Sequence, residues 1–217
     1  MTNILIRFLA TFVFACITIF SVIGLSFVTE IDIDQMTRDV TAIAGINPFS
    51  GLLSNLGILL WSVSASICLF VAIAARPNIG KRDFGFLLSS ALLSGWLLFD
   101  DWFLFHETLA YWHLGVEEEW VKLSLVIVFA FYLLHFRKFI LRTSYIFLIA
   151  AAGLFLSSIL VDVFFEETLN LQWVVFFEDA LKWLGICFWC SYYVDTAYQV
   201  LVTAYGVSRL PTLSRSR

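Results

Sequence analysis

Long apolar runs constrain this chain more than any other feature of its sequence. Several runs exceed about 18 residues with very few charged side chains, which is the mark of helices that cross a bilayer. The composition agrees, because 61% of the residues are apolar and 14% are charged, whereas soluble domains are nearer half apolar and a quarter charged. The sequence therefore predicts an all-α membrane protein that crosses the lipid bilayer several times.

Six such runs follow one another, and we expect residues 1–217 to form a single integral membrane domain. The predicted transmembrane helices are at about 4–28, 51–75, 84–105, 117–136, 145–165 and 174–194. The first run exceeds the apolar core of a signal peptide, so we interpret it as an uncleaved anchor, with a cleaved signal peptide as the alternative. In the outer loop 29–50, apolar residues recur at helical spacing from Ile33 to Ile43. This spacing predicts a short surface helix that ends at Asn47-Pro48.

Charge placement predicts how the helices are oriented. The loops after the second and fourth runs and both termini carry most of the Lys and Arg, whereas the loops after the first, third and fifth runs are acidic. Because positively charged loops stay on the cytoplasmic side, both termini are predicted to be cytoplasmic. The net charge of −4 argues against a nucleic-acid partner, since phosphate binding needs clustered Lys and Arg.

An internal repeat organises the second half of the chain. Residues 105–132 match residues 165–192 without a gap. The shared positions include Glu107-Thr108-Leu109 with Glu167-Thr168-Leu169, and Glu118 and Lys122 with Glu178 and Lys182. We interpret spans 3–4 and 5–6 as tandem parallel hairpin repeats that form a four-helix bundle; shared composition at membrane boundaries is the alternative. The second span is rich in small residues and is predicted to pack centrally.

Acidic side chains are predicted to gather in one layer just under the outer membrane boundary. At a rise of about 1.5 Å per residue, Asp100 and Asp101 fall about 24 Å along the third helix from its basic end, and Asp162 reaches a similar height in the fifth. The layer contains Asp100, Asp101, Glu107, Glu117, Glu118, Glu119, Asp162, Glu166, Glu167, Glu178 and Asp179, with His106, His113, Lys122 and Lys182. Carboxylates crowded at low dielectric must take up protons or a cation.

Helical spacing predicts which of these groups lie together. Asp100 and Glu107 are seven residues apart and are expected to share one helix face. Glu118 precedes Lys122 by four residues, the favoured spacing for an ion pair, and the sixth helix repeats this pattern. Acidic residues also suit the first turn of a helix, which is the structural alternative for the fourth and sixth helices.

A metal site is the first functional hypothesis. Helices that each present carboxylates inward, with a histidine nearby, are similar to the carboxylate di-metal arrangement of four-helix bundles, although Glu-x-x-His is missing here. The predicted ligands are Asp100, Asp101, His106, Glu107, Glu118, Glu119, Asp162, Glu166, Glu167, Glu178 and Asp179, with Lys122 and Lys182 as charge partners. Such oxygen-rich ligands favour a divalent cation, Mg²⁺, Ca²⁺, Mn²⁺ or iron in preference to zinc. The site would bind or handle the cation, or assist chemistry on a substrate in the membrane.

Two alternatives stay open beside the metal hypothesis. The Asp/Glu/Lys layer is also what a proton-coupled transporter places inside the membrane. An assembly or sensing subunit without catalytic activity would use the same acidic rim to bind a membrane-protein partner or a second copy of the chain. The sequence does not decide between an enzyme and a protein without enzymatic activity.

Two motifs resemble those of a known group of proteins. They are Asp100-Asp101-x-Phe103-x-x-His106-Glu107 and Glu178-Asp179-Ala-Leu-Lys182-Trp-Leu-Gly185. Both are similar to motifs in uncharacterised bacterial multi-pass membrane proteins, which carry an acidic pair followed by His-Glu at one helix end and a later acidic pair that opens a Gly-containing helix. The resemblance covers the second half of the chain. It implies a location in the bacterial inner (cell) membrane and implies no activity.

Overall fold

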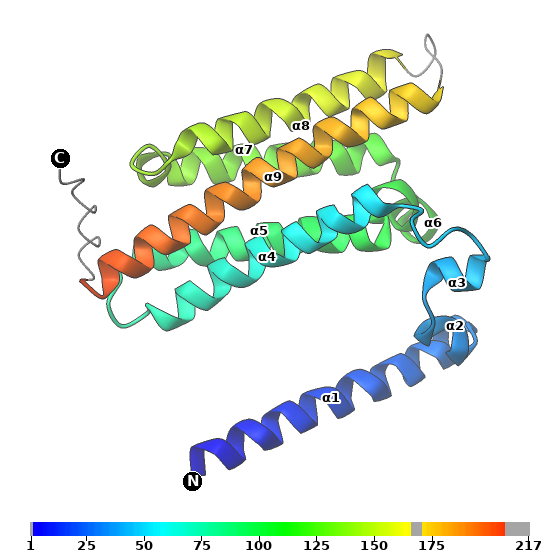
Figure 1. The fold of residues 1–217 in the computed structure, drawn as a ribbon, viewed down its shortest axis with the longest axis horizontal. Coiled ribbons are helices and arrows are strands. Elements are labelled where there is room, and N and C mark those ends of the chain that lie inside the picture. Colours follow the sequence, from blue (N-terminus) through cyan, green and yellow to red (C-terminus); the bar gives the residue numbers. More distant parts are fainter. Residues whose placement is uncertain (1, 166–170, 207–217) are drawn as a thin grey trace, which may run out of the picture. The chain divides into compact units, whose positions relative to one another are not determined.

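The computed structural model describes residues 2–165 and 171–206, which form two compact units, Met1–Gly51 and Leu52–Arg217 (Figure 1). All the regular secondary structure in the described residues is helical, which confirms the predicted all-α class. Four helices in this part of the chain are long and apolar enough to cross a membrane: Ile4–Thr29, Leu52–Ala74, Lys81–Phe103 and Glu118–Ile140. Their apolar outer faces imply contact with lipid.

The first unit contains α1 (Thr2–Thr29), α2 (Ile33–Thr37) and α3 (Val40–Ala44). No side chain in the most apolar stretch of α1 is buried, as expected for a helix surrounded by lipid. The single surface helix predicted after it is instead two short helices, because Arg38 between them has an extended backbone. The second of them ends at Gly45 rather than at Asn47-Pro48, since Gly45 adopts the left-handed conformation (φ 64°) that stops a helix.

The second unit contains the helices that surround the candidate site. They are α4 (Leu52–Ala74), α5 (Lys81–Phe103), the π-helix η1 (Phe105–Leu109), α6 (Ala110–Leu114), α7 (Glu118–Ile140), α8 (Tyr145–Phe165) and α9 (Leu171–Ala204). Most of these bounds lie within a few residues of the predicted ones, although α9 extends ten residues past its predicted end. At about 1.5 Å per residue, α8 and α9 are also long enough to cross a bilayer, but α9 carries several charged residues. The fifth and sixth spans therefore stay predictions.

Helix α4 packs against both α5 and α9, while α8 lies along α9 (Figure 1). Small buried residues on α4, including Gly57 and Ser64, let its neighbours approach closely. A Cβ atom on Gly57 would lie 3.0 Å from Ile186 Cδ1 of α9. The central position predicted for the second span is confirmed. The tandem-repeat bundle stays a prediction, because α4, which lies outside the repeat, takes part in the same packing.

The core of the second unit is aromatic and contains a small hydroxyl network. Phe86, Tyr132, Trp189 and Tyr193 are all buried, at most 5% exposed. The Ser90 hydroxyl lies 2.8 Å from the Tyr132 hydroxyl, which also accepts a hydrogen bond of 3.1 Å from Tyr193. Because buried hydroxyls without partners are costly, this network also fixes how α5, α7 and α9 face one another.

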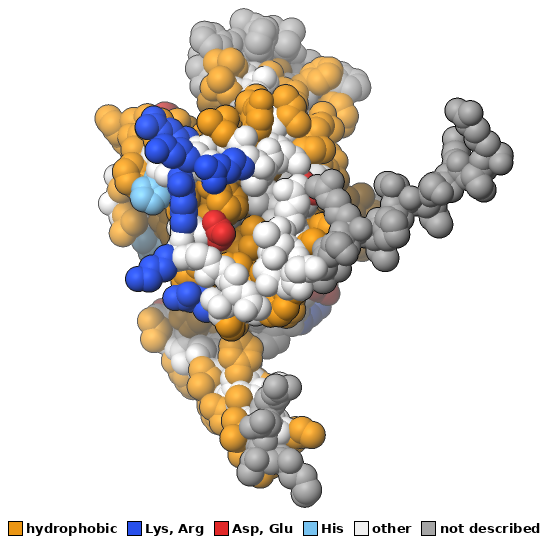
Figure 2. All heavy atoms as spheres, turned by 90° about the vertical axis from the view of Figure 1, so that its left-hand side faces the viewer, with side chains coloured by type: hydrophobic (Ala, Val, Ile, Leu, Met, Phe, Trp, Pro, Cys, Tyr) orange, Lys and Arg blue, Asp and Glu red, His pale blue; other side chains and the backbone are white. Residues whose placement is uncertain are grey.

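The two basic loops lie at one end of the second unit. Figure 1 places the α4–α5 and α7–α8 connections at the same end, and Figure 2 shows Lys and Arg side chains gathered there. These connections and the adjoining helix ends contain Arg76, Lys81, Arg82, Arg137, Lys138 and Arg142. The alternation of basic and acidic ends agrees with the charge pattern of the sequence, and which end faces the cytoplasm stays a prediction.

Candidate functional site

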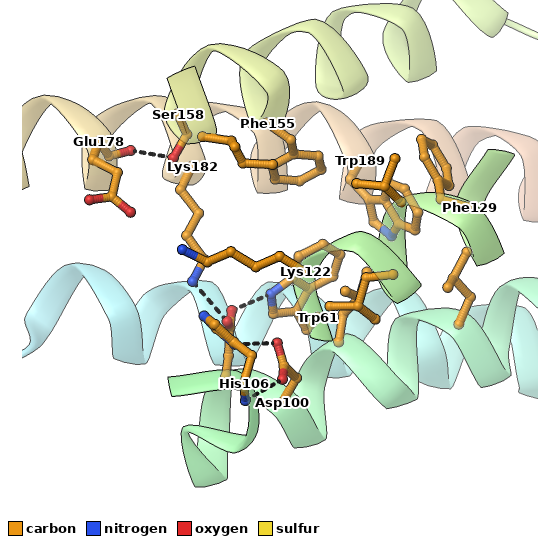
Figure 3. Close-up of a pocket in the computed structure, with 16 residues that line it drawn as sticks. Trp61, Asp100, His106, Lys122, Phe129, Phe155, Ser158, Glu178, Lys182 and Trp189 are labelled. Atoms are coloured by element: carbon orange, nitrogen blue, oxygen red, sulfur yellow. Dashed lines mark hydrogen bonds and ion pairs between the residues drawn. The ribbon is translucent and has the colours of Figure 1, made fainter. Parts of the chain in front are cut away.

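A partly open cavity of about 190 Å³ lies in the second unit (Figure 3). Asp100 and Asp101, which line it, lie near the C-terminal end of α5, whereas the basic residues Lys81 and Arg82 lie at its N-terminal end. The cavity is lined by α4, α5, η1, α7, α8 and α9. The lining residues are Trp61, Leu93, Leu97, Asp100, Asp101, His106, Lys122, Leu125, Val126, Phe129, Phe155, Ser158, Ile159, Glu178, Lys182 and Trp189. Charged side chains occupy one end of the cavity, and apolar side chains make up most of its wall.

Four aromatic rings form much of the apolar wall. Trp61 stacks on Phe155 with ring centroids 5.9 Å apart and meets Trp189 edge-on at 5.4 Å. Phe129 approaches Trp189 at 5.3 Å from the α7 side. The Trp189 indole N–H donates a 3.0 Å hydrogen bond to Ser94 Oγ, so its polar atom is satisfied and its ring faces the cavity.

The charged end is built around a break between α5 and η1. Leu104 ends α5 with a left-handed backbone (φ 50°, ψ 45°), which is costly for a residue with a Cβ atom. The chain then winds one π-helical turn, a feature found often at functional sites. The expectation that Asp100 and Glu107 share one helix face was wrong, because the α-helix between them does not continue.

The break brings His106 back onto Asp100. The Asp100 carboxylate accepts a 3.0 Å hydrogen bond from the His106 backbone N–H, and its other oxygen lies 2.7 Å from His106 Nδ1. Both side chains are buried, 4% and 11% exposed. This contact places the proton of a neutral imidazole on Nδ1, because an ionised carboxylate only accepts. The opposite ring nitrogen, Nε2, lies 3.5 Å from Glu107 Oε1.

The environment of His106 stabilises its protonated form. Burial by itself favours the neutral imidazole and lowers the pKa, but the hydrogen bond and charge of Asp100 outweigh burial. Glu107 acts in the same direction as Asp100, and Lys182 opposes both. The net effect raises the pKa of His106 above its ordinary value of 6.5.

Asp101 connects three helices. Its Oδ2 atom accepts a 2.7 Å hydrogen bond from the Trp61 indole N–H of α4. Its Oδ1 atom lies 2.9 Å from Lys182 Nζ of α9. Because both carboxylate oxygens have a donor, the burial of this charge is compensated. Lys182 thus pairs with Asp101 on α5 rather than with Glu178 one turn before it on its own helix.

The other predicted residues are placed as follows. Glu118 and Lys122 form the predicted ion pair at 2.7 Å, and Lys122 and Glu178 line the cavity. Asp179 lines a smaller pocket of about 30 Å³, which Asp101 and Lys182 also line. Side chains that point to solvent or lipid belong to Glu117, Glu119 and His113. Glu166 and Glu167 lie outside the described residues, as does the side chain of Asp162 in the last turn of α8.

The described side chains do not by themselves form a metal centre. Among them, no three of His, Cys, Asp and Glu lie close enough together to hold a metal ion. The physical reason is that the oxygens of Asp100 and Asp101 already face N–H donors. In this part of the chain His106 Nε2 and Glu107 Oε1 lie 3.5 Å apart.

Sequence reasoning missed the aromatic half of the site. Trp61 of α4 and Phe155 of α8 line the cavity, yet both lie in apolar runs where an aromatic residue carries no distinctive signal. Trp61 could have been identified from the sequence as a residue that needs a buried hydrogen-bond acceptor, because its indole N–H lies within an apolar span. The π-helical turn at residues 105–109 has no sequence signature that we used.

The comparisons with known proteins give a family and no activity. A family model described as a domain of unknown function (DUF8692) matches residues 10–196. No curated protein and no solved structure matches the chain. Since the family model spans most of the sequence, including every helix that lines the cavity, the chain belongs to the DUF8692 family.

Proposed function

We propose that this protein binds an amphipathic molecule from the bilayer, with an apolar group in the aromatic cavity and an anionic or other hydrogen-bond-accepting group at Lys182 and His106. The observation that carries the proposal is the cavity of about 190 Å³, whose apolar wall ends at a charged group that includes these two nitrogen-bearing side chains. Sites for small molecules have this composition: mostly apolar surface with a few convergent polar groups.

The hydrogen-bond donors and acceptors at the charged end of the cavity indicate that the ligand carries an acceptor. The two aspartates of the cavity have a donor on every carboxylate oxygen. An ammonium group carries three N–H bonds, and Lys182 uses one of them on Asp101 among the described residues. His106 Nε2, which lies 3.5 Å from Glu107 Oε1, adds a further donor when the imidazole is protonated. A carboxylate or phosphate oxygen would satisfy these N–H groups.

The wall composition supports entry from the lipid. Val126 of α7 lines the cavity and is 51% exposed, and Leu125 and Ile159 beside it are partly exposed. An opening lined by these side chains of α7 and α8 would admit a molecule dissolved in the bilayer without passage through water. The ligand would therefore be a membrane amphiphile rather than a water-soluble metabolite.

The test is binding of tritiated dodecanoate to the purified protein in phosphatidylcholine nanodiscs, with unlabelled dodecanol as a competitor that lacks the carboxylate. A hydrogen bond to a charged group contributes about 1.5–3 kcal/mol, so dodecanol should compete about tenfold to a hundredfold less well than dodecanoate. Lys182→Gln should weaken dodecanoate by a similar factor. Lys138→Gln, an exposed lysine at the basic end, is the matched control and should change nothing.

The variant Asp101→Asn/Lys182→Gln separates ligand recognition from the loss of the buried ion pair. It keeps neutral polar groups in place of both charges, so the second unit should remain folded while dodecanoate binding stays weak. Equal competition by the acid and the alcohol, or equal effects of the two lysine variants, would overturn the proposal.

A divalent cation site is the second candidate, favoured by one contact. Asp100 contacts His106 Nδ1, and His106 Nε2 lies 3.5 Å from Glu107 Oε1. Histidines that bind metals commonly have a carboxylate on their other ring nitrogen in this way. Further ligands would come from the predicted acids Glu166 and Glu167, or from water. Mg²⁺, Ca²⁺, Mn²⁺ or iron would suit this set better than zinc.

Elemental analysis of the purified protein tests the metal candidate. Stoichiometric metal that is lost in His106→Gln and in Glu107→Gln would support it, with Glu119→Gln as the control for an exposed acid. Metal-free protein whose thermal stability is indifferent to chelators would refute it. Proton-coupled transport, catalysis and an assembly or sensing role with a protein partner stay predictions from the sequence.

A further inference from the structure

Gly185 on α9 lies against the ring of Phe155 on α8. A Cβ atom placed on Gly185 would lie 2.6 Å from Phe155 Cε1 and 2.7 Å from Cδ1. Side-chain carbons do not approach so closely, so any larger residue at this position would displace the ring. Gly185 is itself buried within the α8–α9 contact.

The position of the Phe155 ring determines the width of the cavity. The ring lines the cavity, stacks on Trp61 at 5.9 Å and meets Trp189 at 6.2 Å (Figure 3). Trp61 and Trp189 are 2% and 1% exposed, so both rings are themselves tightly covered. A Phe155 ring pushed away from Gly185 would change the shape of the cavity that it lines.

The cavity volume indicates what fits beside this ring. An engineered apolar cavity of about 150 Å³ binds benzene, and the cavity here measures about 190 Å³. A single six-membered ring or an alkyl segment of similar size therefore fits this cavity. A fused two-ring group is larger than the ring for which a cavity of comparable volume is sufficient.

We propose that Gly185 is a specificity-determining residue, which holds Phe155 back against α9 and so admits an amphiphile with one benzene-sized group next to its acidic end. The inference rests on the proposed binding function and adds a size limit to it. The selection acts through the apolar wall, so it is independent of recognition by Lys182.

The experiment measures how phenylbutanoate and naphthylbutanoate displace tritiated dodecanoate from the protein in nanodiscs. The wild-type protein should bind the phenyl acid about tenfold or more tightly than the naphthyl acid, the usual discrimination that one ill-fitting group causes in an apolar pocket. Gly185→Ala should weaken the phenyl acid by about tenfold. Gly153→Ala on α8 is the matched control, because a Cβ atom there meets nothing within 4 Å.

Two further variants keep the inference falsifiable if Gly185→Ala folds poorly. Phe155→Leu should admit the naphthyl acid, and Gly185→Ala/Phe155→Leu should bind the phenyl acid as the wild-type protein does, because the smaller side chain leaves room for the new methyl group. Equal binding by the two glycine variants, or a double variant that stays weak although folded, would overturn the inference. Wild-type protein that binds none of the acids would instead overturn the proposed function.

Discussion

The Asp100–His106 contact gives the sharpest prediction, because replacing Asp100 Oδ2 with an amide nitrogen should affect the protonated imidazole of His106 more than the neutral one. In Asp100→Asn the amide oxygen still accepts from the His106 backbone N–H. The amide nitrogen that replaces the second oxygen is a donor, so it meets the Nδ1–H of a protonated imidazole with the wrong polarity. A neutral imidazole can change tautomer and accept this N–H bond. The variant should therefore be damaged most where His106 is protonated.

The stability that Asp100→Asn should lose follows from the burial of the Asp100–His106 pair. A hydrogen bond to a charged partner contributes about 1.5–3 kcal/mol, and side chains 4% and 11% exposed are little screened by solvent. Asp100→Asn should lose about this much stability at low pH and about 1 kcal/mol or less at high pH. For a unit of this size the low-pH loss lowers the melting temperature by roughly 4–10 °C.

The direction in which stability changes with pH follows from the direction in which the pKa of His106 is shifted. The pKa of His106 is raised in the folded protein, so its stabilisation is fully present below the ordinary value of about 6.5 and is lost as the pH rises through the folded value. Thermal unfolding in detergent micelles at about pH 5.5 and about pH 9 measures this change. The wild-type protein should show it, and Asp100→Asn should not.

Glu119→Gln is the control, because it removes an exposed acid from the same predicted layer and should change stability by less than about 0.5 kcal/mol. If Asp100→Asn kept the wild-type pH dependence, or lost no more stability than this control at low pH, the assignment of a protonated His106 held by Asp100 would be refuted.

Three further predictions concern the framework of the site, each measured by thermal unfolding in micelles. Leu104→Gly should leave the stability of the fold unchanged or raise it, because glycine adopts the left-handed backbone at φ 50° without strain. The control Leu92→Gly, in the middle of α5, should lower the stability by about 1 kcal/mol beyond the loss of its side-chain contacts. Trp61→Phe should lose about 1.5–3 kcal/mol by leaving one oxygen of Asp101 without its donor, and a loss restored by Trp61→Phe/Asp101→Asn would identify that hydrogen bond as the cause. Tyr132→Phe should cost about 1–2 kcal/mol because two buried hydroxyl groups lose their shared partner, and a silent substitution would show that the network contributes nothing.

The sequence by itself determined the helical class and the bounds of most helices. A bilayer core needs about 20 apolar residues per crossing, so the length of each run shows where a helix begins and ends, as it does for α4 and α5. Counting along these helices also placed Asp100 and Asp101 at one level with Lys182 one turn further in, and the structure brings these three residues to one cavity. The level of these residues could be predicted because it depends only on the helical rise per residue, which is a local property of the chain.

The tertiary structure alone decided which helices face one another and therefore which charged groups pair across helices. Lys182 pairs with Asp101 rather than with Glu178, because α4 and α5 pack beside α9 and bring a partner closer than its own helix does. The aromatic wall likewise depends on the approach of α8 to Gly185. Side-chain partners across helices are set by packing between distant segments, such as Ser94 and Trp189, which are 95 residues apart. The spacing of residues within one helix carries no information about such contacts.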